Sequence, residues 1–474
     1  MITATQNETL KLKADHRLGY VWLISVVAAM GGLLFGYDWI VISGTDLFYE
    51  AHFHLTSSLQ TGWAKSSALL GCLLGALLAG AFSDRFGRKR LLALSALLFA
   101  VSSVATGLAG TFGIFIFWRI VGGGAIGLAS NLSPLYIAEV APAEARGRLV
   151  SLNQLTIVIG ILLAQFVNWR IGSLHPLPPQ PAMAQIAASW AGQTGWRWMF
   201  GVTAIPALVF LAGMFFVPES PRWLAKRGDV GRARTVLGKI GGANYADAAL
   251  ADIAATLANE TLRVNFLDLL APKLKRILVL GVVLAVLQQW CGINVIFYYA
   301  KDIFRESGFN VSDILLNIVF IGSVNLVATL VALQTVDRWG RRPLLLGGYA
   351  GLAALFLAMG LGFAFHSRGI HMLVLVLAAI GCYALSLAPV TWVVISEIFP
   401  NRIRGAAMAV AVSALWIACF VLTFTFPYLN ATLGPAGTFW VYATICAGGF
   451  VFIKFKLPET KGKTLEQIER ELVD

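Results

Sequence analysis

An isolated carboxylate lies in a long apolar stretch near the start of the chain. Residues 20–45 read YVWLISVVAAMGGLLFGYDWIVISGT, and Asp38 is the one charged residue between Arg17 and Asp46. This length exceeds the roughly 20 apolar residues that a helix needs to cross a bilayer. Because an ionised side chain at the centre of such a helix costs about 2.5–3.5 kcal/mol, Asp38 needs a partner, a water-filled cavity or a proton. Each of these predicts a path for a polar species through the membrane. The alternative is an Asp that only caps a helix end before Gly44.

Arg119 is the one cation of another apolar stretch, residues 112–134, and is the candidate partner of Asp38. An ionised acid beside a guanidinium has a lowered proton affinity, and separating the two or burying the acid raises that affinity. A conformational change that alters their distance would therefore bind and release a proton. The alternative is a static structural salt bridge.

A strip of polar side chains lies on a further apolar segment and consists of Gln288, Gln289, Asn294 and Tyr298. Residues three, four or seven positions apart share a helix face, so this set is expected to face one way. Amides both donate and accept hydrogen bonds, which suits the neutral hydroxyls of a sugar. Gly292 is expected to let the helix bend or part. The alternative is hydrogen bonding between helices, worth about 0.6 kcal/mol per contact.

Charged motifs recur in the two halves of the chain. DRFGRKR (84–90) returns as DRWGRRP (337–343), and PESPRWL (218–224) is echoed by PETKGKTLE (458–466). Such duplication predicts two parallel bundles about an axis along the membrane normal, with the polar site between them at mid-depth. The repeated charges are expected to pair at the inner ends of the bundles and to latch the outward-open state; the alternative is that they set topology alone. This set comprises Asp84, Arg85, Arg88, Glu139, Arg146, Asp337, Arg338, Arg341, Glu397 and Arg404.

Composition identifies an integral membrane protein. Of 474 residues, 58% are hydrophobic and 13% are charged, against about 25% charged in soluble domains. The net charge is +12, and 29 of the 36 Lys and Arg residues lie in segments expected on one side, with five in the opposite loops. This is the positive-inside pattern, with both termini cytoplasmic, so the basic excess does not indicate nucleic-acid binding. The five cysteines lack metal-ligand spacing, and the GxGxxG run at 122–127 follows no strand, so no metal, cofactor or nucleotide is expected.

Twelve apolar segments can be marked. They lie near 20–43, 62–82, 91–110, 112–134, 149–170, 198–217, 276–299, 313–335, 343–364, 371–395, 405–426 and 435–456. The prediction is an all-α membrane protein with twelve transmembrane helices in two six-helix bundles. Its parts are an N-terminal bundle (1–217), a cytoplasmic linker of short helices (218–275), a C-terminal bundle (276–456) and a cytoplasmic tail (457–474). The prolines of HPLPPQP exclude a helix in that part of the 165–197 loop, which should lie outside.

These motifs together resemble the sugar porter family of the major facilitator superfamily. The resemblance extends from GGLLFGYD through WRIVGGGAIG, YIAEVAPAEARGRL, QQWCGINVIFYYA and SEIFPNRIRG to PETKGKTLEQIE, which is nearly the whole chain. Any one motif is weak, but all of them in this order on a twelve-segment background are specific. The chain resembles the bacterial proton-coupled D-xylose and hexose symporters most closely, and animal glucose facilitators more distantly.

The resemblance implies a role for each part of the site. Asp38 and Arg119 would couple the proton, and because facilitators that need no proton carry an amide at the acid's position, Asp38 favours symport. The implied substrate-binding set is Gln154, Gln288, Gln289, Asn294, Tyr298, Asn325, Trp392 and Trp416, with Phe35 closing over the substrate. The indoles would donate N–H groups while their rings pack on the apolar face of the sugar.

The chain departs from the family's pattern in three places. Leu415 stands where many relatives carry an amide, and Ala388 replaces a common Gly before Pro389, so the identity of the sugar is open. Lys65 lies early in the second segment, where an apolar residue is usual, and is expected to extend to the outer membrane surface.

The prediction is therefore a proton-coupled symporter of a pentose or hexose, with D-xylose or D-glucose first, in the inner membrane of a bacterium. Its expected partners are the monosaccharide, the proton and the lipid bilayer. One open alternative is a proton-independent sugar facilitator, or a polyol transporter, on the same fold. A distant one is a sugar receptor that does not transport. No nucleophile, metal set or cofactor motif indicates an enzyme.

Overall fold

The computed structural model describes residues 18–178, 181–259, 271–367, 369–399, 404–461 and 467. In these ranges all regular structure is helical, and eleven helices are long and apolar enough to cross a membrane. The last of them, Ala406–Lys456, has 51 residues and a non-helical backbone at Gly434 (φ 67°, ψ 173°). At about 1.5 Å per residue it would extend roughly 76 Å, more than twice the ~30 Å hydrocarbon core. It therefore makes two crossings, and the predicted twelve-helix fold is confirmed.

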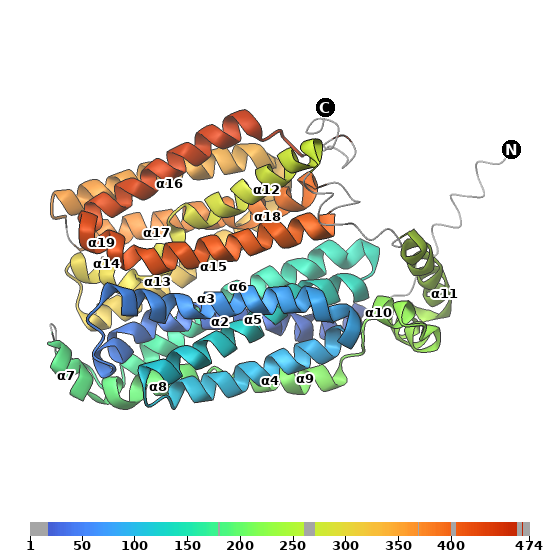
Figure 1. Ribbon diagram of the computed structural model, residues 1–474, viewed down its shortest axis with the longest axis horizontal. Coiled ribbons are helices and arrows are strands. Elements are labelled where there is room, and N and C mark those ends of the chain that lie inside the picture. The colour runs from blue at the N-terminus through green and yellow to red at the C-terminus, as the bar shows by residue number, and fades with distance from the viewer. Residues whose placement is uncertain are drawn as a thin grey trace.

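The two halves of the chain form two stacked groups of helices, blue to green and yellow to red (Figure 1). The first half contains α2 (Leu18–His52), α3 (Ser58–Phe86), α4 (Arg88–Gly107), α5 (Phe112–Val140), α6 (Ala143–Gly172), α7 (Met183–Ala188), η2 (Ala191–Gly195), α8 (Trp196–Gly201) and α9 (Ala204–Phe216). The second contains α12 (Pro272–Trp290), α13 (Ile293–Tyr298), α14 (Ala300–Glu306), α15 (Val311–Trp339), α16 (Arg341–Ala364), α17 (Ile370–Leu385), α18 (Leu387–Ile398) and α19 (Arg404–Lys456). The stretch between the halves forms α10 (Pro221–Lys226) and α11 (Val230–Asn259), at one end of the bundles.

Helices α10 and α11, between the two halves of the chain, dock on the first half. Helix α11 is interrupted at Gly241 and Gly242, where φ of Gly242 is 82°, so it comprises two helical pieces. In α10, Nε1 of Trp223 donates a hydrogen bond to the Asp84 carbonyl (3.0 Å), and Nζ of Lys226 lies 2.7 Å from the Asp84 carboxylate. The end of the bundles that carries α10 and α11 is called the inner end below, and the opposite end is the outer end.

The first helix is longer than predicted. Helix α2 runs past the expected end at residue 43 to His52, which places Asp38 in its interior. The alternative that Asp38 caps a helix end is therefore wrong. The extension is possible because the charged side chains of Asp46 and Glu50 are paired inside the protein, as shown below.

Glycines let α3 and α5 approach each other closely. A Cβ atom built on Gly123 would lie 2.0 Å from the Ala68 carbonyl oxygen, and one on Gly127 would lie 2.2 Å from that of Cys72. On α3, a Cβ on Gly75 would lie 2.1 Å from the Gly124 carbonyl oxygen. The glycine run therefore serves helix packing, which is the usual role of small residues in membrane helices. This packing holds Arg119, on the same helix, beside the first half's core.

Candidate functional site

Asp38 and Arg119 form a buried ion pair. Nη1 of Arg119 lies 2.6 Å from Oδ1 of Asp38, and the two residues are 3% and 5% exposed. Oδ2 of Asp38 has no hydrogen-bond partner among the described residues. The guanidinium also lies over the ring of Phe200, 5.5 Å from its centroid. The structure thus joins the two charges that the sequence singled out, and it leaves one carboxylate oxygen without a donor.

The predicted polar strip forms a chain of hydrogen bonds. Nδ2 of Asn294 donates to Oε1 of Gln289, whose Nε2 donates to Oε1 of Gln288 (2.6 Å). Nε2 of Gln288 then donates to the hydroxyl of Tyr383 on α17 (2.6 Å). The helix parts at Gly292, which has the left-handed φ of 89°, so the strip spans the junction of α12 and α13. The expected break is confirmed, and Tyr383 is a member that sequence reasoning missed.

Aromatic rings from both halves meet beside this chain. Phe35 and Trp39 of α2 are stacked, with centroids 5.4 Å apart and planes 7° apart. Phe35 also lies 5.8 Å from the ring of Trp416 on α19, and Trp39 lies 6.2 Å from that of Tyr298 on α13. Phe35, Tyr298 and Trp416 were predicted site residues, whereas Trp39 was missed. Its signal was its spacing, since it lies four positions after Phe35 and hence on the same helix face.

Three predicted sugar contacts lie outside the hydrogen-bonded chain among the described residues. Gln154 on α6 is half-buried, Asn325 on α15 is 5% exposed and Trp392 on α18 is 38% exposed. Leu415, which replaces the common amide, is buried beside Trp416. The predicted set therefore comes from α2, α6, α12, α13, α15, α18 and α19, which belong to both halves of the molecule.

The repeated charges at the inner end form matching pairs in each half. Nη2 of Arg88 lies 3.0 Å from Oε1 of Glu139 in the first half, and Nη2 of Arg341 lies 3.1 Å from Oε1 of Glu397 in the second. These pairs bridge helices of the same half. The duplication inferred from sequence is thus visible in the side-chain contacts.

A second duplicated contact fixes the start of α4 and of α16. Glu219 accepts hydrogen bonds from the backbone N–H groups of Arg88 and Lys89, and Glu459 accepts them from those of Arg341 and Arg342. Burial raises the pKa of the Glu459 carboxyl, but backbone donors, with the N–H of Lys461 first and those of Arg341 and Arg342 after it, outweigh burial and lower that pKa. The two PES and PET motifs therefore cap the helices that carry Arg88 and Arg341.

The remaining members of the predicted gate are placed as follows. Asp84 contacts Arg88 and Lys226. Three of the arginines are exposed: Arg85, Arg146 and Arg338. The side chains of Asp337 and Arg404 lie outside the described part of the structure. The pairing of these groups between the two halves stays a prediction.

The prediction for Lys65 is wrong. Its side chain is fully buried rather than directed to the membrane surface, and its Nζ lies 2.7 Å from Oδ2 of Asp46. The physical reason is that a buried cation with a carboxylate partner needs no route to water.

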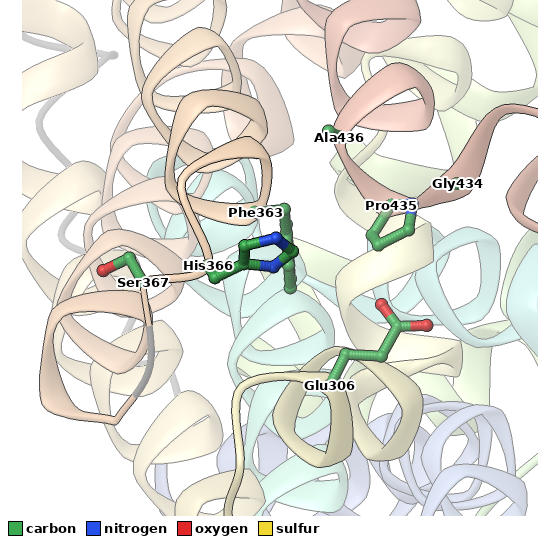
Figure 2. A pocket seen from close by; sticks show the side chains of 7 residues that line it. All are labelled: Glu306, Phe363, His366, Ser367, Gly434, Pro435 and Ala436. Carbon is green, nitrogen blue, oxygen red and sulfur yellow. The ribbon is translucent and has the colours of Figure 1, made fainter.

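A small pocket of about 240 Å³ lies elsewhere, at the outer end of the second half (Figure 2). The side chains of Glu306 and His366 face its opening, with Pro435 beside them. It contains none of the predicted sugar contacts, and its volume is below the roughly 300 Å³ typical of small-molecule sites. It is therefore not the candidate site.

A family model and characterised proteins match this chain over nearly its whole length. The family model described as sugar (and other) transporter matches residues 24–472. The D-xylose-proton symporter of Escherichia coli (strain K12) is 38% identical over 489 residues, with 97% of each chain covered. The glucose transport protein of Synechocystis sp. is 42% identical over 463 residues, with 95% of this chain and 97% of that protein covered.

The fold comparison gives the same result. The partially occluded inward-open conformation of the xylose transporter XylE from E. coli matches with a TM-score of 0.82 at 37% identity, covering 94% of this chain and 100% of that one. Taken with the family model, these similarities extend over almost the whole length of the chain. This chain therefore belongs to the sugar porter family of the major facilitator superfamily.

Proposed function

We propose that this chain is a proton-coupled symporter that carries one monosaccharide inward together with a proton, with D-xylose and D-glucose as the first candidates. Its family transports monosaccharides, and the names of the two relatives are a D-xylose-proton symporter and a glucose transport protein. The observation that supports proton coupling is the buried pair of Asp38 and Arg119. A proton on Asp38 would neutralise it and weaken the pair, so protonation and helix rearrangement become linked.

The proposed sugar site lies between the halves. The amide chain of Gln288, Gln289 and Asn294 supplies both donors and acceptors, and the rings of Phe35 and Trp416 supply apolar surface from opposite halves. Since the rings belong to different halves, a sugar bound among them contacts both halves and favours the state in which the halves close on it.

We place the protein in the bacterial cytoplasmic membrane, with both termini inside.

Uptake by proteoliposomes tests this proposal directly. Purified protein is expected to concentrate labelled D-xylose or D-glucose against its gradient when the outside is more acidic, and a protonophore is expected to abolish the accumulation. Equal uptake with and without the protonophore would favour the facilitator instead. Absence of binding to any sugar or polyol would contradict the proposal, whereas binding without transport would favour a receptor.

Replacement of Leu415 by an amide is expected to tighten sugar binding. Leu415 is 4% exposed and adjoins Trp416, so the Leu415→Gln side chain would lie at the proposed site. One added hydrogen bond contributes about 0.5–1.5 kcal/mol, which is roughly a two- to twelvefold lower Kd. Equilibrium binding of D-xylose and D-glucose measures the change for each sugar. Leu422→Gln, at another buried leucine of α19, is the control, and an equal effect in both variants would remove Leu415 from the site.

The inner charges are proposed to latch the outward-open state. Neutralising Glu397 removes the carboxylate that Arg341 contacts, and a latch role predicts a shift toward the inward-open state of about tenfold. Hydrogen–deuterium exchange at the inner ends of α5 and α18 measures this shift in the Glu397→Gln variant. Unchanged exchange would mean that these charges serve topology alone. Asp313→Asn, at an exposed carboxylate in the first turn of α15, is the control.

A further inference from the structure

Five charged residues gather at the outer end of the molecule. They are Asp46 and Glu50 of α2, Lys65 of α3, and Lys301 and Asp302 of α14. Lys65, Asp46, Lys301 and Glu50 are 0%, 1%, 4% and 8% exposed, and Asp302 lies at the rim. We call this set the outer charge network.

The network joins the two halves of the chain. Lys65, from the first half, donates to the backbone carbonyl of Tyr298 (3.0 Å) and lies 3.8 Å from Oδ2 of Asp302, both in the second half. Lys301, from the second half, lies 2.5 Å from Oε2 of Glu50 and 3.6 Å from Oδ2 of Asp46, both in the first. Each lysine thus contacts a carboxylate of the opposite half.

The network lies on the same face of α2 as the aromatic residues of the candidate site. Phe35, Trp39, Asp46 and Glu50 follow one another at spacings of four, seven and four residues, which keeps them on one side of a helix. Counting from the centre of α2 to its outer end, the aromatic pair comes first and the two carboxylates follow. The charges therefore lie between the proposed sugar site and the outer water.

The energetics of this arrangement depend on the conformational state. Removing one partner from a buried ion pair costs several kcal/mol, because the remaining charge stays buried without compensation. If the two halves part at the outer end, water can instead solvate the groups that pair across the boundary, such as Lys301 and Glu50. A buried pair adds little to stability when compared with apolar residues of similar size, so the network is poorly explained as a stabiliser of the fold. It is better explained as a contact that favours one arrangement of the halves.

We propose that the outer charge network is an ionic gate, which closes the outer face by pairing the two halves and must separate before a sugar enters from outside. Lys65 and Lys301 are its central residues, since each contacts acids across the boundary. The gate concerns alternating access and is independent of which sugar is carried and of whether a proton accompanies it.

Hydrogen–deuterium exchange in the absence of sugar tests the gate. In Lys301→Met, Glu50 loses its partner, so the outer face is expected to open and the segments 42–52 and 300–306 are expected to exchange at least about tenfold faster. The inner ends of α5 and α18 are expected to exchange more slowly, because opening outside closes the inside. Exchanging the two charges, in the double variant Glu50→Lys with Lys301→Glu, is expected to restore exchange to near the original rate.

Two further variants keep the test decisive. Glu50→Gln keeps the shape of the side chain and removes one charge, so it serves if Lys301→Met does not fold, and it is expected to change exchange in the same directions. Arg234→Met, which removes a cation from the exposed pair with Asp247 in α11, is the matched control and should leave both ends unchanged. Faster exchange throughout both halves, without slowing at the inner ends, would show a purely structural network. Unchanged exchange at the outer segments, or failure of the charge exchange to restore it, would also overturn the gate.

Discussion

The Asp38→Asn variant is expected to carry its sugar across the membrane without concentrating it. An amide neither binds nor releases a proton at physiological pH, so the proton gradient can no longer drive the cycle. The ratio of internal to external sugar is expected to fall to about one under an imposed pH gradient, while exchange of labelled for unlabelled sugar continues. Proteoliposomes loaded with D-xylose or D-glucose measure both quantities on one preparation.

The geometry of the pair decides which controls are needed. Nη1 of Arg119 lies 2.6 Å from Oδ1 of Asp38, and both side chains are buried, so Asp38→Asn leaves a buried guanidinium without its charge partner. Such a loss costs about 3–5 kcal/mol and threatens folding. The double variant Asp38→Asn with Arg119→Met removes both charges, and it is expected to fold better and to remain uncoupled. Asp313→Asn controls for the loss of an acid. Accumulation equal to that of the original protein, in both Asp38 variants, would eliminate this carboxylate as the coupling group.

The fold followed from the sequence because a bilayer leaves few choices. Every spanning segment must satisfy its backbone hydrogen bonds internally, so long apolar runs become helices and can be counted. The limits of those helices were less predictable. Asp46 and Glu50 look like the end of a membrane segment in the sequence, yet α2 continues through them because Lys65 and Lys301 neutralise them. That information lies in residues of other helices, which no local pattern reveals.

In the candidate site, too, local patterns could be predicted from the sequence, whereas contacts between helices could not. The amides on either side of Gly292 could be recognised from their spacing, and the glycine predicted the break between α12 and α13. Trp39 is one of several aromatic residues of α2, and the apolar residues around Tyr383 in α17 carry no polar pattern that would mark it. The roles of both appeared only when helices were placed beside one another. Lys65 was assigned to the membrane surface for a similar reason, since its partners come from α2 and α13.

Replacing Gln289 is expected to impair sugar binding more than any other single change in the amide chain. Gln289 accepts from Asn294 and donates to Gln288, so Gln289→Ala removes its own polar groups and releases both neighbours from their hydrogen bonds. Unsatisfied buried groups and lost sugar contacts together cost about 1–3 kcal/mol, which raises Kd roughly five- to 150-fold. Equilibrium binding of labelled sugar to purified protein measures the effect.

This variant also separates sugar binding from hydrogen bonding that only connects helices. A connecting role predicts a lower thermal stability with an unchanged Kd, because the chain ends on Tyr383 of a different helix. A binding role predicts a weakened Kd, and added sugar should then raise the Tm of the variant less than that of the original protein. Asn317→Ala, at a buried amide of α15 outside the predicted set, is the matched control and should leave Kd unchanged. If Gln289→Ala lowered stability alone, the sugar site would have to lie elsewhere between the halves.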